Sequence, residues 1–345
     1  MPGSALKGPT ADDLASAARQ LQYALDESAT TNEAFQKLYA AVDPQKRDNL
    51  QQLENLLRSS DSDAAPNKRL RLSAFPTLAW LLRQSAAPAR SAAALFAEFR
   101  RHQSLSAASI VAIWSDFSAF LTYLAAVLGV LMVVVGLFTV LVLPQFKSLY
   151  SGFGEELPAM TSAVFGQRSL VFTLMSGAAL GLLAFLSWFL FQLRRQVRRY
   201  LPMPAGYRKL PLVGPVTSTY NQYLWLTYTG LLRAAGMPTD RALAVAGNRL
   251  TQPRAGDWNT PPGEMQIPGE IATPVVIGNL SLAAKFGKLD AETQFQQEAS
   301  VDAFLTALAR CRRRSRLVLT VLVYFLVASF VSAMYLPIFS LGSAI

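Results

Sequence analysis

Two residue types that build many catalytic and metal sites are almost missing from this 345-residue chain, which has one cysteine and one histidine. Cys311 cannot form a disulfide within the chain, and a single histidine excludes a site with several histidine ligands. His102 lies in a basic, polar stretch that predicts a surface or helix-end position. The adjacent Glu155 and Glu156 would not face each other on a helix, so we expect a solvated acidic pair.

Motifs for chemistry are also missing. The sequence has no Gly-x-x-x-x-Gly-Lys-Ser/Thr phosphate loop, and it offers no residue suited to act as the general base of a serine nucleophile. We therefore predict that the chain is not an enzyme and has no cofactor and no metal site.

Charge is missing from three long apolar runs. Phe117–Leu143, Ser169–Leu193 and Leu317–Leu336 contain 27, 25 and 20 residues without Asp, Glu, Lys or Arg. About 20 apolar residues in a helix span the core of a bilayer, so we predict three transmembrane helices rather than buried helices of a soluble protein. Charged groups inside a span usually mark ion or proton paths, so their absence argues against a pump or coupled transporter.

The positive charge predicts the topology. Residues 194–316 carry 17 basic and 8 acidic side chains, whereas residues 1–116 carry 13 and 12. Basic residues near span ends mark the cytoplasmic side. The basic groups that flank the spans are Arg194, Arg195, Arg198, Arg199, Arg310, Arg312, Arg313, Arg314 and Arg316. They also suit anionic lipid headgroups or an acidic partner, whereas nucleic-acid binding is not expected, because the clusters lie beside the spans without interleaved aromatics.

These observations predict an all-α integral membrane protein. We expect cytoplasmic helical domains at 1–116 and 194–316, spans at 117–143, 169–193 and 317–336, and periplasmic segments at 144–168 and 337–345. The polar, mixed-charge first 30 residues predict no signal peptide. The expected location is a bacterial inner membrane, with the N-terminus in the cytoplasm.

Helical spacing predicts the soluble elements. Apolar residues recur at helical intervals from Leu14 to Leu57, with a break at Asp43-Pro44, and a polar loop is expected over Ser59–Ser73. Helices are expected from Phe75 through Leu82, from Ser91 to His102 and from Ala291 to Arg310. The Pro- and Gly-rich run Thr251–Pro274 predicts a long irregular loop.

The segment from Gly206 to Arg249 predicts a tight helical hairpin. A turn-rich Leu210-Pro211-Leu212-Val213-Gly214 precedes a helix that contains Leu231 and Leu232. Gly236 suits the end of that helix, and Pro238 suits the first turn of the next.

Two features concern the spans themselves. The phrase Leu-Pro-x-Phe occurs at Leu143–Phe146 and again at Leu336–Phe339, and we expect Pro144 and Pro337 to stop their helices. The repeat suggests a duplicated unit of helical domain and span. Gly177 and Gly181, four residues apart, predict close helix packing, either within the chain or between subunits.

In combination, these motifs resemble the type II secretion F family, the inner-membrane platform proteins of type II secretion systems and type IV pili. The hairpin is similar to the family's "LPLxG … TLxxLLxAGxPxxxAL" pattern. Pro144, Phe146, Leu157, Pro158 and Thr161 match its "PxF … LPxxT" segment, and Pro337 and Phe339 match its "LPIF" terminus. The chain departs from the family at two places. Gln84-Ser85 stands where the family has Gly-Glu, and Ala283-Ala284 stands where it has an acidic residue. The acidic metal site that the family would imply is therefore not carried over. The departures suggest a short type IVb or conjugative-pilus branch.

The resemblance implies a non-enzymatic platform that couples a hexameric cytoplasmic assembly ATPase to the insertion of pilins or pseudopilins into a filament. Other inner-membrane assembly proteins and further copies of the chain are the remaining expected partners. Alternatives are a multi-span transporter or permease subunit, which would need polar residues lining its spans, and a membrane enzyme, which would need a catalytic cluster.

Overall fold

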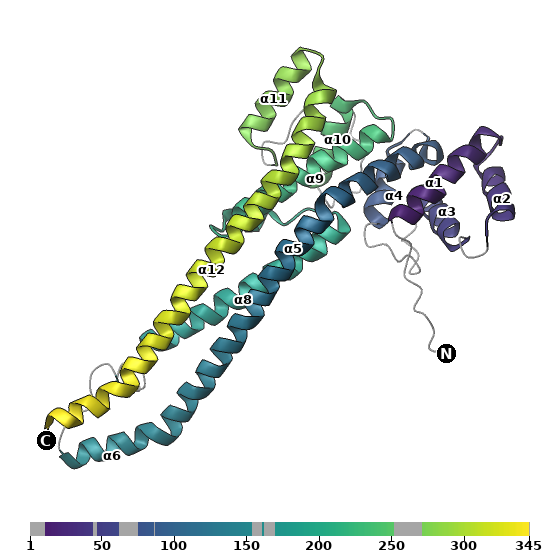
Figure 1. Cartoon of the computed structure of the whole chain (residues 1–345). Coiled ribbons are helices and arrows are strands. Elements are labelled where there is room, and N and C mark those ends of the chain that lie inside the picture. Colours follow the sequence, from purple (N-terminus) through teal and green to yellow (C-terminus); the bar gives the residue numbers. More distant parts are fainter. Residues whose placement is uncertain are drawn as a thin grey trace. The chain divides into compact units, whose positions relative to one another are not determined.

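The computed structural model describes residues 11–43, 47–61, 75–85, 87–153, 161, 170–251 and 271–344 (Figure 1). These residues form helices joined by turns, with no strand among them, so the all-α prediction is confirmed for the described part. Contacts divide the chain into unit 1, Met1–Val111 with Leu193–Leu308, and unit 2, Ala112–Gln192 with Ala309–Ile345. The two predicted cytoplasmic domains and their duplication stay predictions.

Four helices begin unit 1: α1 (Ala11–Asp26), α2 (Thr31–Ala41), α3 (Arg47–Asp61) and α4 (Phe75–Arg83). Their apolar stripes face one another, and Leu21 and Leu53 are fully buried. The Thr30 side chain accepts a hydrogen bond from the Glu33 backbone N–H at 3.2 Å and caps α2. The predicted break at Asp43 is confirmed, while Pro44 and residues 62–73 of the predicted loop lie outside the described residues.

Helix α5 (Pro88–Leu137) is one continuous helix of 50 residues. The predicted helix end near His102 is therefore wrong. Residues 103–116 contain neither glycine nor proline, so nothing in the sequence interrupts the helix there.

The rest of unit 1 comes from the second half of the chain. It contains the end of α8 (Leu170–Arg199), the 3₁₀ turn η3 (Ala205–Lys209), α9 (Gly214–Ala234), α10 (Thr239–Thr251) and α11 (Pro274–Lys285). Helix α12 (Leu289–Ala344) begins in this unit and has 56 residues. The hairpin α9–α10 and the helix expected from Ala291 are confirmed. Helix α11 has no counterpart among the predicted helices, and residues 252–270 of the predicted loop lie outside the described residues.

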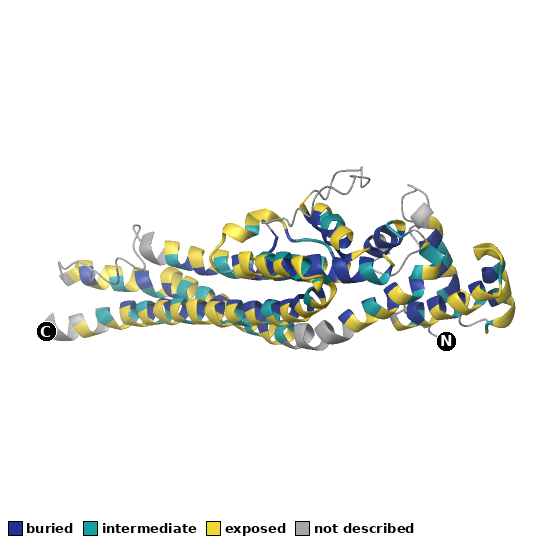
Figure 2. Ribbon diagram, turned by 90° about the horizontal axis from the view of Figure 1, so that it is seen from above, coloured by how far each residue is buried: buried dark blue, intermediate teal, exposed yellow. Residues whose placement is uncertain are grey.

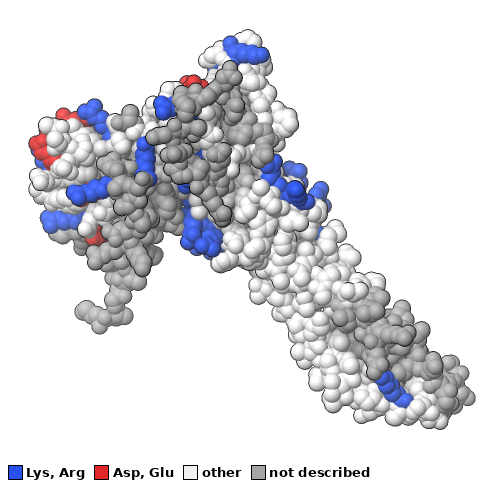
Figure 3. Space-filling model, turned by 180° about the vertical axis from the view of Figure 1, so that it is seen from behind, with Lys and Arg blue, Asp and Glu red and all other residues white. Residues whose placement is uncertain are grey.

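Three helical stretches are long and apolar enough to cross a membrane: Ile113–Gly152, Leu174–Arg199 and Leu289–Leu336. Many of their apolar residues are exposed (Figure 2), including Val140 at 71% and Tyr324 at 70%. On the face drawn in Figure 3, long stretches of unit 2 show no charged side chain. Apolar surface on this scale suits contact with lipid rather than water. The long apolar helices of unit 2 are therefore suited to insertion into a membrane.

The prediction that Pro144 and Pro337 stop their helices is wrong. A π-helical turn, η2 (Phe138–Val142), follows α5, and α6 (Leu143–Phe153) continues from it. The Leu143 N–H donates to the Phe138 carbonyl, five residues back, so the wider turn provides space for the proline ring. Helix α12 likewise runs past Pro337 to Ala344.

Candidate functional site

The chain approaches the α9–α10 hairpin through a tight turn. The Gly214 N–H donates to the Leu210 carbonyl at 2.8 Å. A Cβ at Gly214 would lie 2.4 Å from the Arg208 carbonyl oxygen, so no other residue fits there. Leu210 and Pro211 are exposed. Of these three predicted residues, Gly214 shapes the turn and the other two remain on its surface.

The hairpin tip has a helix-ending geometry that needs glycine. Gly236 has a φ of +90°, and the Met237 N–H donates to the Leu232 carbonyl at 3.1 Å, five residues back. Leu231 and Leu232 are buried on the inner side of α9. Pro238 is exposed and precedes α10 by one residue, instead of lying in its first turn as predicted. The Gly236 prediction is confirmed.

The N-terminal part of unit 1 packs on this hairpin. The hydroxyls of Ser85 and Ser91 both donate to the carbonyl of Ala235, at 3.1 and 3.0 Å. The rings of Trp80 and Tyr228 lie 5.5 Å apart. Hydrogen bonds from residues about 145 positions earlier in the sequence therefore hold the C-terminal end of α9 against the N-terminal part of unit 1.

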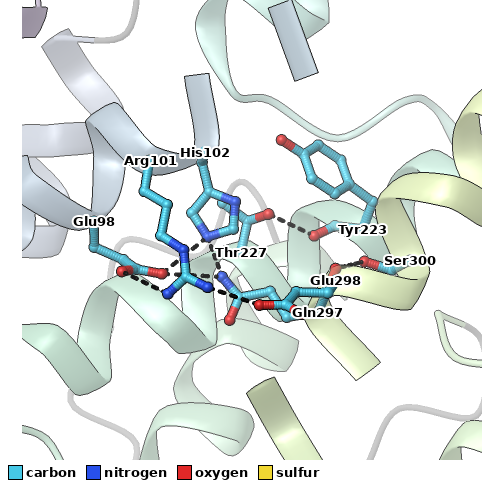
Figure 4. A network of polar contacts seen from close by, with 8 residues as sticks. All are labelled: Glu98, Arg101, His102, Tyr223, Thr227, Gln297, Glu298 and Ser300. Carbon is cyan, nitrogen blue, oxygen red and sulfur yellow. Dashed lines mark hydrogen bonds and ion pairs between the residues drawn. The ribbon is translucent and has the colours of Figure 1, made fainter. Parts of the chain in front are cut away.

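A polar network joins α5 and α12, with its centre buried, and Tyr223 and Thr227 of α9 lie beside it (Figure 4). At its centre the side-chain amide of Gln297 contacts the ring of His102, and the two side chains are only 5% and 3% exposed. His102 Nε2 also lies 3.3 Å from Glu98 Oε1. The residues drawn in Figure 4 are Glu98, Arg101, His102, Tyr223, Thr227, Gln297, Glu298 and Ser300, of which Tyr223 takes part through its backbone carbonyl.

Electrostatics favour an ionised Glu98 in this network. The hydrogen bond with His102 lowers the pKa of the Glu98 carboxyl and outweighs burial, which would raise it. Arg101 pairs with Glu298 at 2.7 Å, but both side chains are about half exposed, so solvent screens this pair. The cavity between these residues is only about 10 Å³, roughly the volume that one water needs. The network therefore joins helices and leaves no room for a substrate.

Gly230 makes space for the central amide. A Cβ at this position of α9 would lie 2.7 Å from the Gln297 Nε2. Beside it, the rings of Tyr223 and Phe304 stack with centroids 6.0 Å apart. The backbone of α9 thus approaches α12 closely at the level of the network.

The prediction that His102 is a surface or helix-end residue is wrong, because it lies buried within α5. Leu95 and Phe99 precede it by seven and three residues, which places all three on one face of the helix. That spacing was the signal for burial. The polar spacing of Thr293, Gln297 and Ser300 is the corresponding signal on α12.

Two of the family-motif residues of unit 2, Phe146 and Thr161, contact an apolar cluster that contains Phe138, Phe330 and Ala333. Phe138 contacts both Phe146 and Phe330, with centroids 6.5 and 6.0 Å apart. The Thr161 hydroxyl is buried and donates to the Ala333 carbonyl at 2.9 Å. Phe339 is 73% exposed, and Leu157 and Pro158 lie outside the described residues.

Gly177 and Gly181 of α8 are exposed, and a Cβ added to either would meet no atom within 4 Å. They make no close helix contact within the described part of the chain. Packing between subunits stays a prediction.

The arginines predicted to flank the spans occupy two helices. Arg194, Arg195, Arg198 and Arg199 are exposed near the end of α8. On α12, Arg313 and Arg314 are exposed, while Arg312 is 34% exposed and pairs with Asp116 at 3.0 Å. These groups can meet anionic partners or lipid. Within the described ranges, no group of three His, Cys, Asp or Glu residues could hold a metal ion.

Comparisons with protein-family models, curated proteins and solved structures found no match to this chain.

Proposed function

We propose that this chain is a platform protein of a type IV pilus or type II secretion machine in a bacterial inner membrane. In this proposal it is not an enzyme. Its cytoplasmic helices receive motion from a hexameric assembly ATPase, and its spans present pilin or pseudopilin subunits for insertion into a filament. It acts as an oligomer beside other inner-membrane assembly proteins.

The observation that carries the proposal is the α9–α10 hairpin, because it contains the most extensive family-like motif of the chain. Gly214 has no space for a Cβ, Gly236 has a positive φ, and Leu231 and Leu232 are buried. These roles explain the apolar and glycine positions of the motif by packing. Pro238 is exposed at the tip, so its side chain and the neighbouring exposed Asp240 and Arg241 are our candidates for the ATPase contact.

The continuity of α5 and α12 supports a coupling role. Each helix contains both a network residue, His102 or Gln297, and a stretch apolar enough to cross a membrane. A helix transmits displacement along its axis because its backbone hydrogen bonds are internal. In the proposal, the network keeps α5 and α12 in register while the ATPase moves the cytoplasmic helices.

A genetic experiment tests the proposal. Deletion of the coding region should abolish surface filaments or secretion in the host, and the intact chain supplied in trans should restore them. Normal filaments and normal secretion in the deletion strain would refute the platform role. A purified chain that moves a solute across vesicles would instead favour a transporter.

A further inference from the structure

Unit 2 contains an open cavity of about 450 Å³ between α5 and α12. This volume is in the range of small-molecule sites in proteins. Its lining mixes aromatic and charged side chains: Asp116, Ala119, Phe120, Tyr123, Arg312 and Arg316.

The two arginines of this cavity are positioned differently. Arg312 Nη1 lies 3.0 Å from Asp116 Oδ2. The guanidinium of Arg316 lies over the Phe120 ring, 5.0 Å from its centroid, and no described carboxylate is within ion-pair distance of it. Because one carboxylate faces two guanidinium groups, the cavity has an excess positive charge. A planar guanidinium held on an aromatic ring is well suited to bind a phosphate through two N–H groups.

The cavity lies where the apolar spans begin. The charge-free runs start at Phe117 on α5 and at Leu317 on α12, one residue after Asp116 and Arg316. Tyr123 of the lining is 67% exposed, and Leu317, which follows Arg316 in the sequence, is 63% exposed. Tyrosine is enriched at the level of lipid headgroups, and exposed apolar residues suit acyl chains. The lining therefore offers phosphate-binding groups beside a lipid-compatible surface.

We propose that this cavity binds the phosphate of an anionic phospholipid, with Arg316 and Arg312 as its ligands and Tyr123 beside the glycerol region. Asp116 is already paired with Arg312, so no free carboxylate in the lining is left to favour the cationic headgroup of a zwitterionic lipid. Three neighbouring arginines of α12, Arg310, Arg313 and Arg314, add further positive charge. The inference does not depend on the proposed platform function.

Native mass spectrometry of the purified full-length chain tests this inference, with phosphatidylglycerol and phosphatidylcholine as probes. The variant Arg312→Gln with Arg316→Gln removes the cavity charges. The matched control, Arg313→Gln with Arg314→Gln, removes the same charge from exposed positions outside the cavity. We expect the cavity variant to weaken phosphatidylglycerol binding roughly 30-fold, or about 2 kcal/mol for two basic groups near the membrane surface, and the control to weaken it much less.

Three results would overturn the proposal: equal losses in both variants, equal retention of phosphatidylcholine by the unmodified chain, or displacement of phosphatidylglycerol by excess inorganic phosphate. The last result would identify a site for free phosphate instead of lipid. If the double variant melts at a lower temperature than the unmodified chain, Arg316→Gln alone replaces it, since no described ion pair is broken by that change.

Discussion

At the scale of single residues, Gly230 and Gln297 form a tight fit in unit 1. The side-chain amide of Gln297 lies against the α9 backbone at Gly230, whose side chain is a single hydrogen. This arrangement lets one amide contact His102 of α5 while α9 and α12 remain close together. Buried polar groups of this kind are costly to leave without partners, so the fit should be sensitive to one added methyl group.

Gly230→Ala should destabilise the chain by about 1–3 kcal/mol, because the new Cβ displaces the buried Gln297 amide. Thermal unfolding of the detergent-solubilised protein measures this change. Gly278→Ala is the matched control, since Gly278 lies in the interior of α11 with nothing within 4 Å of the added Cβ. The control should be neutral or stabilising by up to about 1 kcal/mol. Equal effects of the two substitutions would contradict the fit.

The network should also give unit 1 an acid-sensitive component of stability. The pKa of Glu98 is lowered from 4.5 in the folded chain, mainly by its hydrogen bond with His102. A lowered carboxyl pKa stabilises the fold above the unfolded pKa, and this contribution disappears as pH falls through the folded pKa. We expect melting temperatures to drop as the pH falls below 4.5, and Glu98→Gln to flatten that drop while costing about 1 kcal/mol near neutral pH. An unchanged pH profile in Glu98→Gln would contradict this role.

Residue roles could be predicted from sequence only where they follow from backbone geometry. Gly236 was predictable because a helix end beside a short turn favours a left-handed residue. The burial of His102 was not predicted, because Arg100 and Arg101 directly before it favour a solvent-exposed position, whereas its spacing with Leu95 and Phe99 favours the buried face. Its contact with Gln297 depends on tertiary packing between segments 195 residues apart, which no local pattern contains.

At the scale of elements, the tip of the α9–α10 hairpin depends on Gly236. An alanine there must adopt a φ near +90°, which places Cβ against its own backbone. Gly236→Ala should destabilise the chain by about 1–2 kcal/mol, measured by thermal unfolding. The control Gly206→Ala adds the same methyl group at an exposed position with open space and should change stability little. An equally stable Gly236→Ala variant would show that the tip can adopt another turn.

Helical patterns predicted most elements but not their continuity. The rule that proline stops a helix failed at Pro144 because a π-helical turn precedes it, and local periodicity does not reveal such a turn. Helix α11 begins at Pro274 and is followed by Gly287 at a φ of +66°, so its limits were visible as helix start and stop signals. It was not predicted, because its first residue, Pro274, is also the last proline of the Pro- and Gly-rich run, which favours a loop.

At the scale of the whole molecule, topology is the first property to measure. The positive-inside rule predicts that α6 faces the periplasm and that the end of α8 faces the cytoplasm. In a Cys311→Ser background, Ser151→Cys should react with a membrane-impermeant maleimide in intact spheroplasts, and Arg195→Cys should react only after lysis. Both positions are exposed. The opposite labelling pattern would invert the predicted topology.

The three helices that are long and apolar enough to cross a membrane were predictable, because a charge-free run of 20 or more residues is typical of a membrane-spanning helix. Contacts between segments distant in the chain were not, as the packing of Ser85 and Ser91 on Ala235 illustrates. The platform function is a proposal that rests on the hairpin motif and the membrane helices together.

Co-purification with the host's assembly ATPase tests that proposal most directly. The unmodified chain and the charge-swapped control Glu33→Lys with Lys37→Glu should retain the ATPase. A charge swap at the hairpin tip, Asp240→Lys with Arg241→Glu, should lose most of it without a change in melting temperature larger than that of the control. Lys37, Asp240 and Arg241 are exposed, the Glu33 side chain is 45% exposed, and both variants keep the net charge of the chain. Failure of the unmodified chain to retain the ATPase would contradict the account.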